Sequence, residues 1–416
     1  MRKRCLAIFF VIIMLFSACA TDKKQDPGAT SLPITDINDP NLKPLDLSDT
    51  EENEVLLCGG SNDAAKAYYE KTYEDYLAVC KFYLQKGFET YNTSEKNGNF
   101  FTTLIKESER IHIYWIACEE ELTIIRSYRQ GKTMPPKEPE ITTGNTPTTV
   151  TQIRGSGENA MGYVIQLADG SFIIYDGGDA TCSSKLLEVL GNLAGHDATN
   201  NKYLVRAWVL TINDEKHYGC FTQIAAEHTD KITLQTVVAA PVGKNMAIAS
   251  KQTYLTQTLP EDVAKFEGAQ ICYVHTGMTL RFCNITMEIL FTQEDLYMCD
   301  PPKDRFGNTS LVSRISTEQK SVLFLSDCGR FAARRMAIYY GKDLKSDICQ
   351  IANHGAEDFP LFIYNIIGAK ILSYPCSADF YDNHKAFADV RQAMKNNSNT
   401  EQIILSDSEN VTIVLD

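Results

Sequence analysis

A buried strand that opens into a polar loop and then into a helix constrains this chain more than any other feature. The run Tyr203 to Leu210 is mostly apolar, and the loop that follows closes at His217, Tyr218 and Gly219. An amphipathic segment comes next, with apolar residues at helical spacing. Loops at the carboxyl ends of strands hold ligands in open α/β layers. The pattern therefore predicts an α/β domain with a ligand site at this loop.

The chain on either side of this strand also alternates strands with helices. Two strands are predicted at 161–167 and 171–176, paired across the tight turn Ala168-Asp169-Gly170. Leucines at helical spacing follow, between positions 186 and 193. Further strands are expected at 232–240, within 271–293, within 310–327, and at 348–353, 369–374, 403–405 and 411–415, with helices at 330–340 and 387–394.

The first half of the chain predicts a smaller α+β unit at 61–128. Tyrosines and leucines recur at helical spacing from Tyr68 to Leu84, and Gly87 suits the end of a helix. This tyrosine stripe is interpreted as a packing face; the alternative is a ligand platform. Four strand-like runs follow, with a hairpin signal at Asn97-Gly98. The simplest assembly is one helix on a four-stranded meander.

The N-terminus is predicted to be a targeting signal. Arg2 to Arg4 form a basic start, and Leu6 to Phe16 form an apolar core too short to span a bilayer. The following Leu-Phe-Ser-Ala-Cys resembles a bacterial lipobox, which implies lipidation of Cys19 and a lipoprotein anchored on the outer face of a bacterial membrane. An ordinary secretory signal cleaved near Ala18 is the alternative.

These patterns divide the chain of 416 residues into about two folded domains with connecting segments. The predicted bounds are: signal peptide 1–19, disordered tether 20–55, small α+β domain 56–130, Pro/Thr-rich linker 131–150 and main domain 151–416.

Charge and cysteine content exclude some functions. The net charge of -13 argues against binding nucleic acid by bulk electrostatics. Eleven of the 13 cysteines remain once Cys5 and Cys19 are set aside, and an odd number cannot all pair within one chain. Most are interpreted as reduced, buried residues.

Six segments of the main domain, taken in order, carry a resemblance to a known family. They are GYVIQLADGSFIIYDGGD, RAWVLTINDEKHYG, FGNTSLVSRI, SVLFLSDCG, DICQIANHGA and SYPCSADFYDNHKAFADV. Together they resemble the metallo-β-lactamase superfamily, of the type found at the C-terminus of the competence protein ComEC. The resemblance covers about residues 150–416 and implies an αββα sandwich, an α/β fold, preceded here by the small α+β domain.

The family motif T-H-x-H-x-D-H aligns with Thr211 to His217. Ile212 stands where the first histidine is expected and cannot bind a metal. Asp214 replaces the second histidine and could bind through its carboxylate. Lys216 replaces the aspartate, and His217 is retained. The resemblance therefore places Asp214, Lys216 and His217 in the former metal loop.

Other segments supply the remaining residues of the implied site. Asp327 corresponds to the bridging aspartate and His354 to the surviving histidine of His-His-Gly. Asp176, Asn308 and His384 are expected to support the ligands. If a metal binds, the resemblance assigns it to Asp214, His217, Asp327 and His354.

Lys216 decides how this set is interpreted. At an effective dielectric constant of about 20, an ammonium about 4 Å from a divalent ion costs on the order of 8 kcal/mol. A two-zinc site is therefore not expected, and the chain is predicted to hold no metal or a single zinc. We also expect Lys216 to fold into the former metal site and pair with Asp327, Asp214 or both.

The sequence is compatible with three functions. The chain could be a surface lipoprotein with a degraded metal site that binds a ligand or partner. It could be a hydrolase of phosphoester-type substrates that uses one metal. It could also be a structural surface protein whose tyrosine-rich unit performs the recognition.

Overall fold

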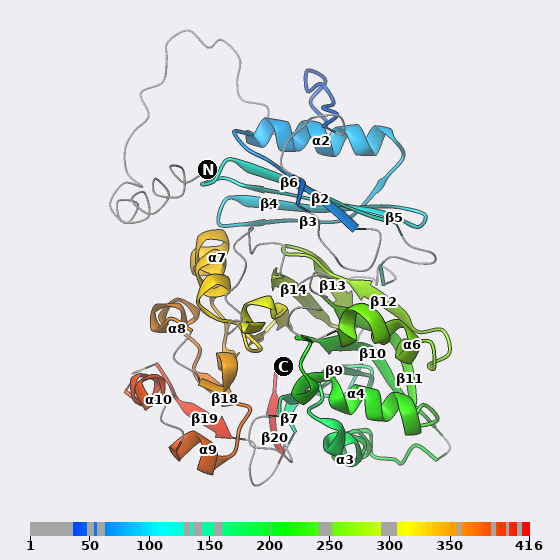
Figure 1. Cartoon of the computed structure of the whole chain (residues 1–416), viewed down its shortest axis with the longest axis vertical. Coiled ribbons are helices and arrows are strands. Elements are labelled where there is room, and N and C mark those ends of the chain that lie inside the picture. Colours follow the sequence, from blue (N-terminus) through cyan, green and yellow to red (C-terminus); the bar gives the residue numbers. More distant parts are fainter. Residues whose placement is uncertain are drawn as a thin grey trace.

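The computed structural model describes most of the chain from residue 36 onward (Figure 1). The described residues are 36–47, 54–55, 63–128, 134–135, 144–153, 160–199, 201–240, 251, 253–292, 306–355, 359–383, 388–396, 399–405 and 410–416. The predicted signal peptide, Cys19 and His384 lie outside them. Within these ranges, no helix is both long and apolar enough to cross a membrane.

Two seven-stranded sheets form the main domain. The order of strands in the first sheet is β12-β11-β10-β9-β8-β7-β20. Its strands are β7 Thr149–Gln152, β8 Gly162–Gln166, β9 Phe172–Asp176, β10 Tyr203–Leu210, β11 Ile232–Ala239, β12 Gln270–Tyr273 and β20 Val411–Val414. β9 to β12 are parallel, whereas β20, β7 and β8 pair antiparallel. The parallel strands bring their carboxyl ends to one edge of the sheet.

The second sheet follows the chain in order from β13 to β19. Its strands are β13 Thr279–Phe282, β14 Ile285–Phe291, β15 Val312–Ser316, β16 Ser321–Phe324, β17 Ile348–Gln350, β18 Ile371–Tyr374 and β19 Gln402–Leu405. β16 to β19 are parallel.

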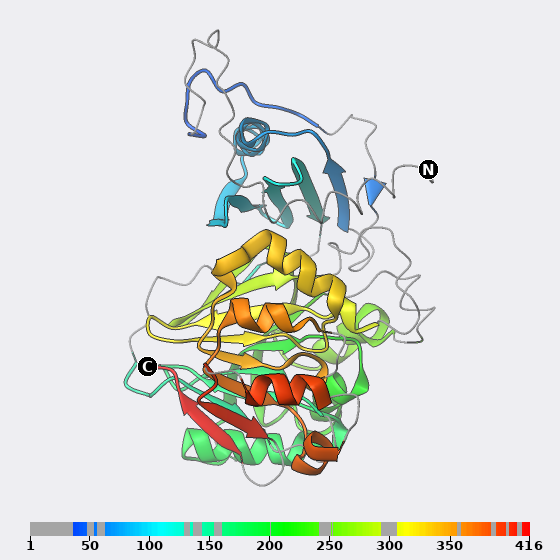
Figure 2. The ribbon, with the colours of Figure 1, turned by 90° about the vertical axis from the view of Figure 1, so that its left-hand side faces the viewer.

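Helices cover the outer face of each sheet, and the inner faces pack against each other. Helices α3 Ser183–Ala194, α4 Glu215–Glu227 and α6 Leu259–Val263 share a core with one face of β10 and β11. Helices α7 Arg330–Tyr340, α8 Leu361–Ile367, α9 Ala378–Asn383 and α10 Ala388–Lys395 share another with the second sheet (Figure 2). A third core lies between the sheets. The predicted αββα sandwich is confirmed.

The N-terminal unit is a six-stranded antiparallel sheet under one helix. Its order is β1-β2-β6-β5-β4-β3, and helix α2 Tyr73–Gln85 packs on one face. The strands are β1 Glu54–Val55, β2 Asp63–Tyr68, β3 Glu89–Lys96, β4 Asn99–Lys106, β5 Glu109–Ile116 and β6 Glu121–Tyr128. The predicted meander of four strands is present as β3 to β6.

The start of the predicted helix is wrong. Residues 63–68 form strand β2, which pairs with β6. The helix begins instead after Thr72, whose hydroxyl accepts from the Asp75 N–H while Asp75 accepts from the Thr72 N–H. This reciprocal capping box fixes the first turn at Tyr73. Tyr68 therefore lies in the sheet, where it is buried.

Part of the segment assigned to the tether packs on this unit. Leu42 and Leu47 are buried in the same core as α2. The Tyr68 hydroxyl donates to the Leu47 carbonyl at 2.9 Å, and the Lys81 ammonium donates to the Asp39 carbonyl at 2.7 Å. Residues 36–47 are thus part of the folded unit and not of a disordered tether.

The other face of the N-terminal sheet is joined to the main domain. The Asn99 side chain donates to the Tyr339 carbonyl at 2.7 Å, and the Phe101 ring stacks on Tyr340 with centroids 6.0 Å apart. A Cβ on Gly277 would lie 1.8 Å from the Phe101 ring, so only glycine fits this contact. The two parts share one hydrophobic core.

We expect Asn99→Ala to destabilise the whole protein by about 1–3 kcal/mol, because it leaves the buried Tyr339 carbonyl and Ala117 N–H without their partner. Denaturant unfolding, followed by circular dichroism and by tryptophan fluorescence, should show one shared transition. Asn92→Ala, on a strand of the same sheet, is the matched control. Two separate transitions would show that the N-terminal unit folds independently.

Candidate functional site

Three side chains from separate loops converge at the carboxyl ends of the strands. His217 lies in the first turn of α4, which follows β10 of the first sheet. Asp327 follows β16, and His354 follows β17, both in the second sheet. One possible ligand atom from each lies within 4.8 Å of the others. The site therefore lies at the edge of the sandwich where the parallel strands end, and both sheets contribute residues to it.

The start of α4 positions His217. Asp214 is the N-cap, and its carboxylate accepts from the Lys216 N–H at 3.0 Å. Aspartate is a favoured N-cap residue, so the helix begins at Glu215 and turns His217 inward. His217 is 1% exposed at the surface.

A buried carboxylate holds the His217 ring. The Nδ1 atom of His217 lies 2.8 Å from Oδ2 of Asp176. Asp176 is fully buried and also accepts from the N–H and hydroxyl of Thr211, both at 2.7 Å. This arrangement fixes Nδ1 as the donor and turns Nε2 toward Asp327, whose Oδ2 lies 3.3 Å away.

The ring of His354 is fixed by a backbone acceptor. Its Nδ1 lies 3.0 Å from the Pro375 carbonyl, to which it must donate. That bond leaves the lone pair on Nε2, which lies 3.5 Å from Oδ1 of Asp327. The Asn353 N–H donates to the Ser326 carbonyl at 2.8 Å and joins this loop to the Asp327 loop.

Left-handed backbone conformations concentrate at these loops. Ten non-glycine residues in the described ranges have positive φ, and four lie here: Asp176, Ser326, Asn353 and His354, at 54°, 50°, 44° and 54°. Each such residue costs on the order of 1–3 kcal/mol unless its surroundings fix it. Asn353 and His354 are consecutive residues with positive φ, so the backbone is strained at this point. This strained turn sets the position of the His354 ring.

The charges of the site depend on one another. Burial alone would lower the pKa of His217, but the carboxylates of Asp327 and Asp176 outweigh it and raise that pKa well above its usual value. Burial would raise the pKa of Asp327, but mainly the charge of His217 lowers it to about 2. His217 is thus an imidazolium between two carboxylates when no metal is bound.

His354 takes the opposite charge state. Burial lowers its pKa and outweighs the attraction of Asp327. A neutral imidazole with a free Nε2 lone pair is the form that binds metals.

Two buried atoms test whether a metal fits. His217 Nε2 and Asp327 Oδ1 make no hydrogen bond to any described residue, although both are buried. Buried polar atoms without a partner are rare and call for an explanation. Two imidazoles and one carboxylate form a donor set suited to a single zinc or iron ion. The residues present therefore fit one metal ion.

Two of the predicted site residues serve other purposes. The Asp214 carboxylate caps α4 and is not among the three side chains that converge, so its assignment as a ligand is wrong. Lys216 is exposed, so the expected burial of its ammonium in the former metal site is wrong. Its charge still contributes to the lowered pKa of Asp327, but less than that of His217. The cation between the carboxylates is His217.

Of the residues expected to support the metal ligands, Asp176 contacts a ligand and Asn308 caps a helix. Asp176 contacts His217 directly, as described above. The side-chain oxygen of Asn308, Oδ1, accepts from the N–H groups of Phe331 and Ala332 and so caps α7, the helix that follows Asp327.

The sequence interpretation missed residues that connect the loops. The hydroxyls of Thr211 and Ser326 lie 2.6 Å apart and join the two sheets above the sandwich. The Gln350 side chain accepts from the Ser326 N–H at 2.6 Å. A glutamine at the end of the apolar run Ile348 to Gln350 was the one available signal for this contact.

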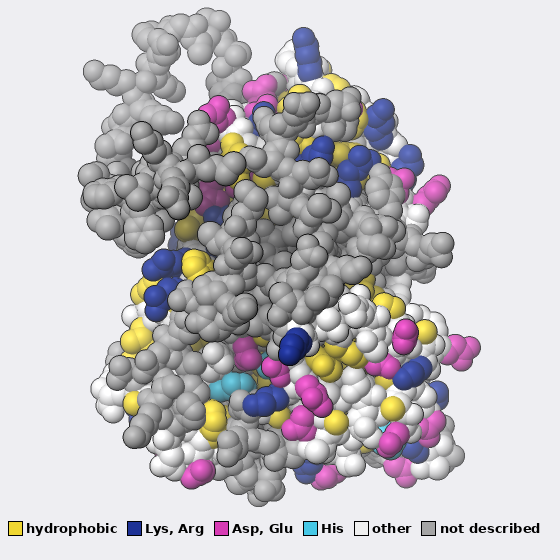
Figure 3. Space-filling model, viewed as in Figure 1, with side chains coloured by type: hydrophobic (Ala, Val, Ile, Leu, Met, Phe, Trp, Pro, Cys, Tyr) yellow, Lys and Arg dark blue, Asp and Glu magenta, His cyan; other side chains and the backbone are white. Residues whose placement is uncertain are grey.

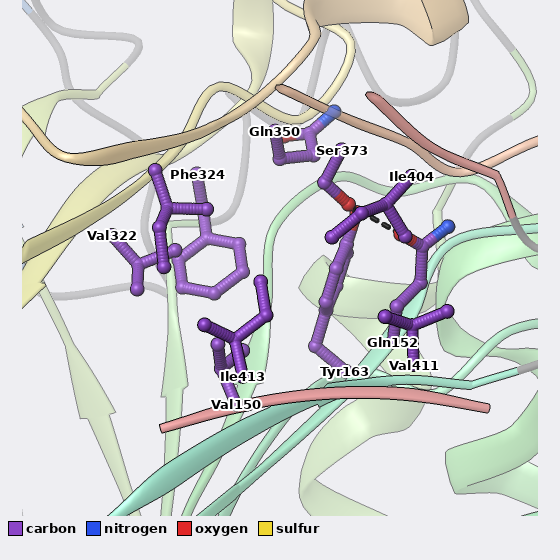
Figure 4. Close-up of a pocket in the computed structure, with 11 residues that line it drawn as sticks. Val150, Gln152, Tyr163, Val322, Phe324, Gln350, Ser373, Ile404, Val411 and Ile413 are labelled. Carbon is purple, nitrogen blue, oxygen red and sulfur yellow. Dashed lines mark hydrogen bonds between the residues drawn. The ribbon is translucent and has the colours of Figure 1, made fainter. Parts of the chain in front are cut away.

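Two cavities in the described part of the chain lie away from the three converging side chains. A cavity of about 10 Å³ between the sheets has room for about one water molecule, and the Tyr163 hydroxyl lies 2.7 Å from the Ser373 hydroxyl at its wall (Figure 4). A groove of about 700 Å³ lies at the opposite ends of β16 to β18, beside Asp347 and Lys370. Neither adjoins His217. Figure 3 shows histidine atoms at the surface of the main domain, with acidic side chains around them.

The chain is similar to solved metallo-β-lactamase fold proteins. YhfI from Bacillus subtilis is 14% identical with a TM-score of 0.39, over 64% of this chain and 99% of its own. Igni18, a metallo hydrolase from Ignicoccus hospitalis, is 13% identical with a TM-score of 0.39, over 65% and 100%. CmlA, a diiron β-hydroxylase from Streptomyces venezuelae, is 12% identical with a TM-score of 0.40, over 67% and 55%. No protein-family model and no curated protein matches the chain.

Proposed function

We propose that this chain binds one divalent metal ion through His217, Asp327 and His354 and is a single-metal hydrolase. The observation that carries the proposal is the convergence of these three side chains, in which two buried atoms, His217 Nε2 and Asp327 Oδ1, make no hydrogen bond to a described residue. Catalytic zinc sites use three protein ligands and keep a further position open. Zinc is the first candidate because both nitrogen donors are imidazoles.

Each residue has a defined task in this proposal. His354 presents its Nε2 lone pair because Pro375 holds its Nδ1–H. His217 presents Nε2 because its Nδ1–H is hydrogen-bonded to Asp176. The same carboxylate makes the ring more basic and therefore a stronger metal ligand. Asp327, whose side chain is 18% exposed, connects the site to solvent. When bound, such an ion supplies a Lewis acid that activates water near neutral pH.

Esters of phosphoric acid are the substrate class that the sequence resemblance implies, and we propose them as the first to test. A second candidate function is binding without turnover. The buried Ile212 and the exposed, charged Lys216 favour it, because they remove the positions from which a second ion would be held.

We expect the purified chain to hold one zinc, measured by inductively coupled plasma mass spectrometry after dialysis. His354→Ala and Asp327→Asn should lose the metal, because each removes one of three ligands. His196→Ala is the control, since that ring is exposed and bonds only locally to the Asp197 carbonyl. Equal zinc in all four proteins would contradict the site, and hydrolysis of an aryl phosphodiester that follows the zinc content would separate the hydrolase from the binding protein.

Export and lipidation at Cys19 stay a proposal based on the N-terminal sequence. Cys19→Ala should then leave the membrane fraction of cells, and retention there would contradict the lipid anchor.

A further inference from the structure

Exposed apolar side chains concentrate on two neighbouring helices. Six large apolar side chains are exposed in the described part of the chain, and four of them belong to α7 and α8. These are Phe331 and Ile338, each 36% exposed, Leu361 at 38% and Phe362 at 45%. Isolated exposed apolar residues need no explanation, but a group on adjacent elements does.

Two exposed arginines lie within the same group. Arg330, Arg334 and Ile338 are four residues apart along α7, so they share one face of the helix with Phe331. We call these four residues, with Leu361 and Phe362, the outer patch. Figure 3 shows hydrophobic and basic side chains side by side at the left-hand edge of the molecule, over the place of α7 and α8 in Figure 1.

The outer patch differs in charge from the rest of the chain. The sequence contains 53 acidic and 40 basic residues, yet neither α7 nor α8 contains an acidic residue. The nearest paired arginine, Arg335, is half-buried and contacts Glu119 of the N-terminal unit at 2.5 Å. A basic, apolar surface on an acidic protein is selective for a negatively charged partner.

The outer patch also lies beside the candidate metal site. α7 begins three residues after Asp327, and α8 begins seven residues after His354. Both helices lie next to each other on the outer face of the second sheet (Figures 1 and 2). The patch therefore borders the strand ends at which His217, Asp327 and His354 meet.

We propose that the outer patch docks on the surface of an anionic lipid bilayer. Phe331, Leu361 and Phe362 would enter the boundary between headgroups and acyl chains, while Arg330 and Arg334 contact lipid phosphates. Arginine suits this position because its alkyl stem stays with the apolar side chains and its guanidinium binds phosphate. The proposal does not depend on the metal.

The size of the patch favours a bilayer over a protein partner. A stable protein interface involves roughly 20–30 residues on each side. The outer patch offers four apolar side chains that are already more than half buried. Shallow insertion into a bilayer needs no complementary surface, and the arginines add attraction at long range.

A tryptophan in the patch reports docking locally. We would place Phe362→Trp in the full chain, which has only two other tryptophans, Trp208 fully buried and Trp115 hydrogen-bonded to the Lys71 carbonyl. The emission of the tryptophan at position 362 should shift to shorter wavelength when phosphatidylglycerol vesicles are added. Brominated acyl chains in the vesicles should quench this emission. Tyr69→Trp and Val414→Trp are matched controls, since these residues are 40% and 47% exposed outside the patch. Neither control should respond.

The arginines test the charge dependence. In the Phe362→Trp background, Arg330→Gln and Arg334→Gln should each weaken vesicle affinity about fivefold, and vesicles of phosphatidylcholine alone should bind weakly. Equal response of the control tryptophans, or no quenching at position 362, would overturn the proposal. A photo-crosslinker at position 362 that captures a protein and no lipid in cells would also overturn it, and would assign the patch to a protein interface.

Discussion

Asp176→Asn is expected to destabilise the metal-free protein by about 3–5 kcal/mol. Asp176 is fully buried and accepts three hydrogen bonds, one of them from the His217 imidazolium. Removing one partner of a buried charge pair leaves the other charge uncompensated. Asparagine has nearly the same shape and tolerates the φ of 54° at this position, so the variant removes the charge and one of the two acceptor oxygens without a change in packing.

The pH dependence separates this effect from a general loss of packing. The pKa of His217 is raised in the folded state, so its contribution to stability is fully present below its unfolded value of about 6.5 and is lost as the pH rises through the folded value. The difference in unfolding free energy between the wild type and Asp176→Asn should therefore decrease as the pH rises through the folded-state pKa of His217. Urea unfolding at several pH values, with chelator present, measures it.

Asp179→Asn is the matched control for this variant. Asp179 lies three residues away and caps a short helical turn by accepting from the Thr181 N–H at 2.9 Å. Asparagine caps as well as aspartate, so stability should change little. A loss below about 1 kcal/mol for Asp176→Asn, or one independent of pH, would show that Asp176 and His217 are not a charged pair.

The fold was largely predictable because its strands are continuous apolar runs. Phe172 to Asp176 and Tyr203 to Leu210 are buried on both faces of the first sheet, and such runs are typical of parallel strands between layers. Strand β2 was not predictable in the same way. Its pairing with β6 joins residues more than 50 positions apart, and local spacing at Tyr68 suits a helix equally well.

The candidate site was predictable in part. Asp327 and His354 follow apolar strands, so their place at one edge of the sandwich follows from parallel strand direction. The roles of Asp214 and Lys216 depend on where α4 begins. The motif alignment fixed their positions in the chain but not the first helical turn, which makes Asp214 the N-cap and leaves Lys216 exposed. The N-cap preference of aspartate was the local signal for that turn.

Zinc binding is expected to tighten about tenfold for each pH unit, up to the raised pKa of His217. The imidazolium of His217 carries a proton on Nε2, the atom that faces Asp327. A metal needs that lone pair, so binding must release the proton. His354 contributes no further proton, because burial lowers its pKa and keeps it neutral. One proton per zinc corresponds to a slope of one in the logarithm of affinity against pH.

The number of released protons can be measured directly. Titration calorimetry in buffers with different ionisation enthalpies gives this number at a fixed pH, and we expect about one near pH 7. Asp176→Asn should release fewer, because His217 then loses one of the two carboxylates that raise its pKa. Release of no proton by the wild type would contradict the imidazolium assigned to His217.

The same proton makes the two forms of the protein respond oppositely to pH. Without metal, the stabilisation from the His217 pair is lost as the pH rises through the raised pKa of His217. With metal, the loss of that proton favours binding, and ligand at 100 times its dissociation constant adds about 2.7 kcal/mol. Thermal unfolding from pH 6 to 9 should therefore show a metal-free protein that weakens and a zinc-dependent gain that grows. Parallel trends in the two series would mean that zinc binds away from His217.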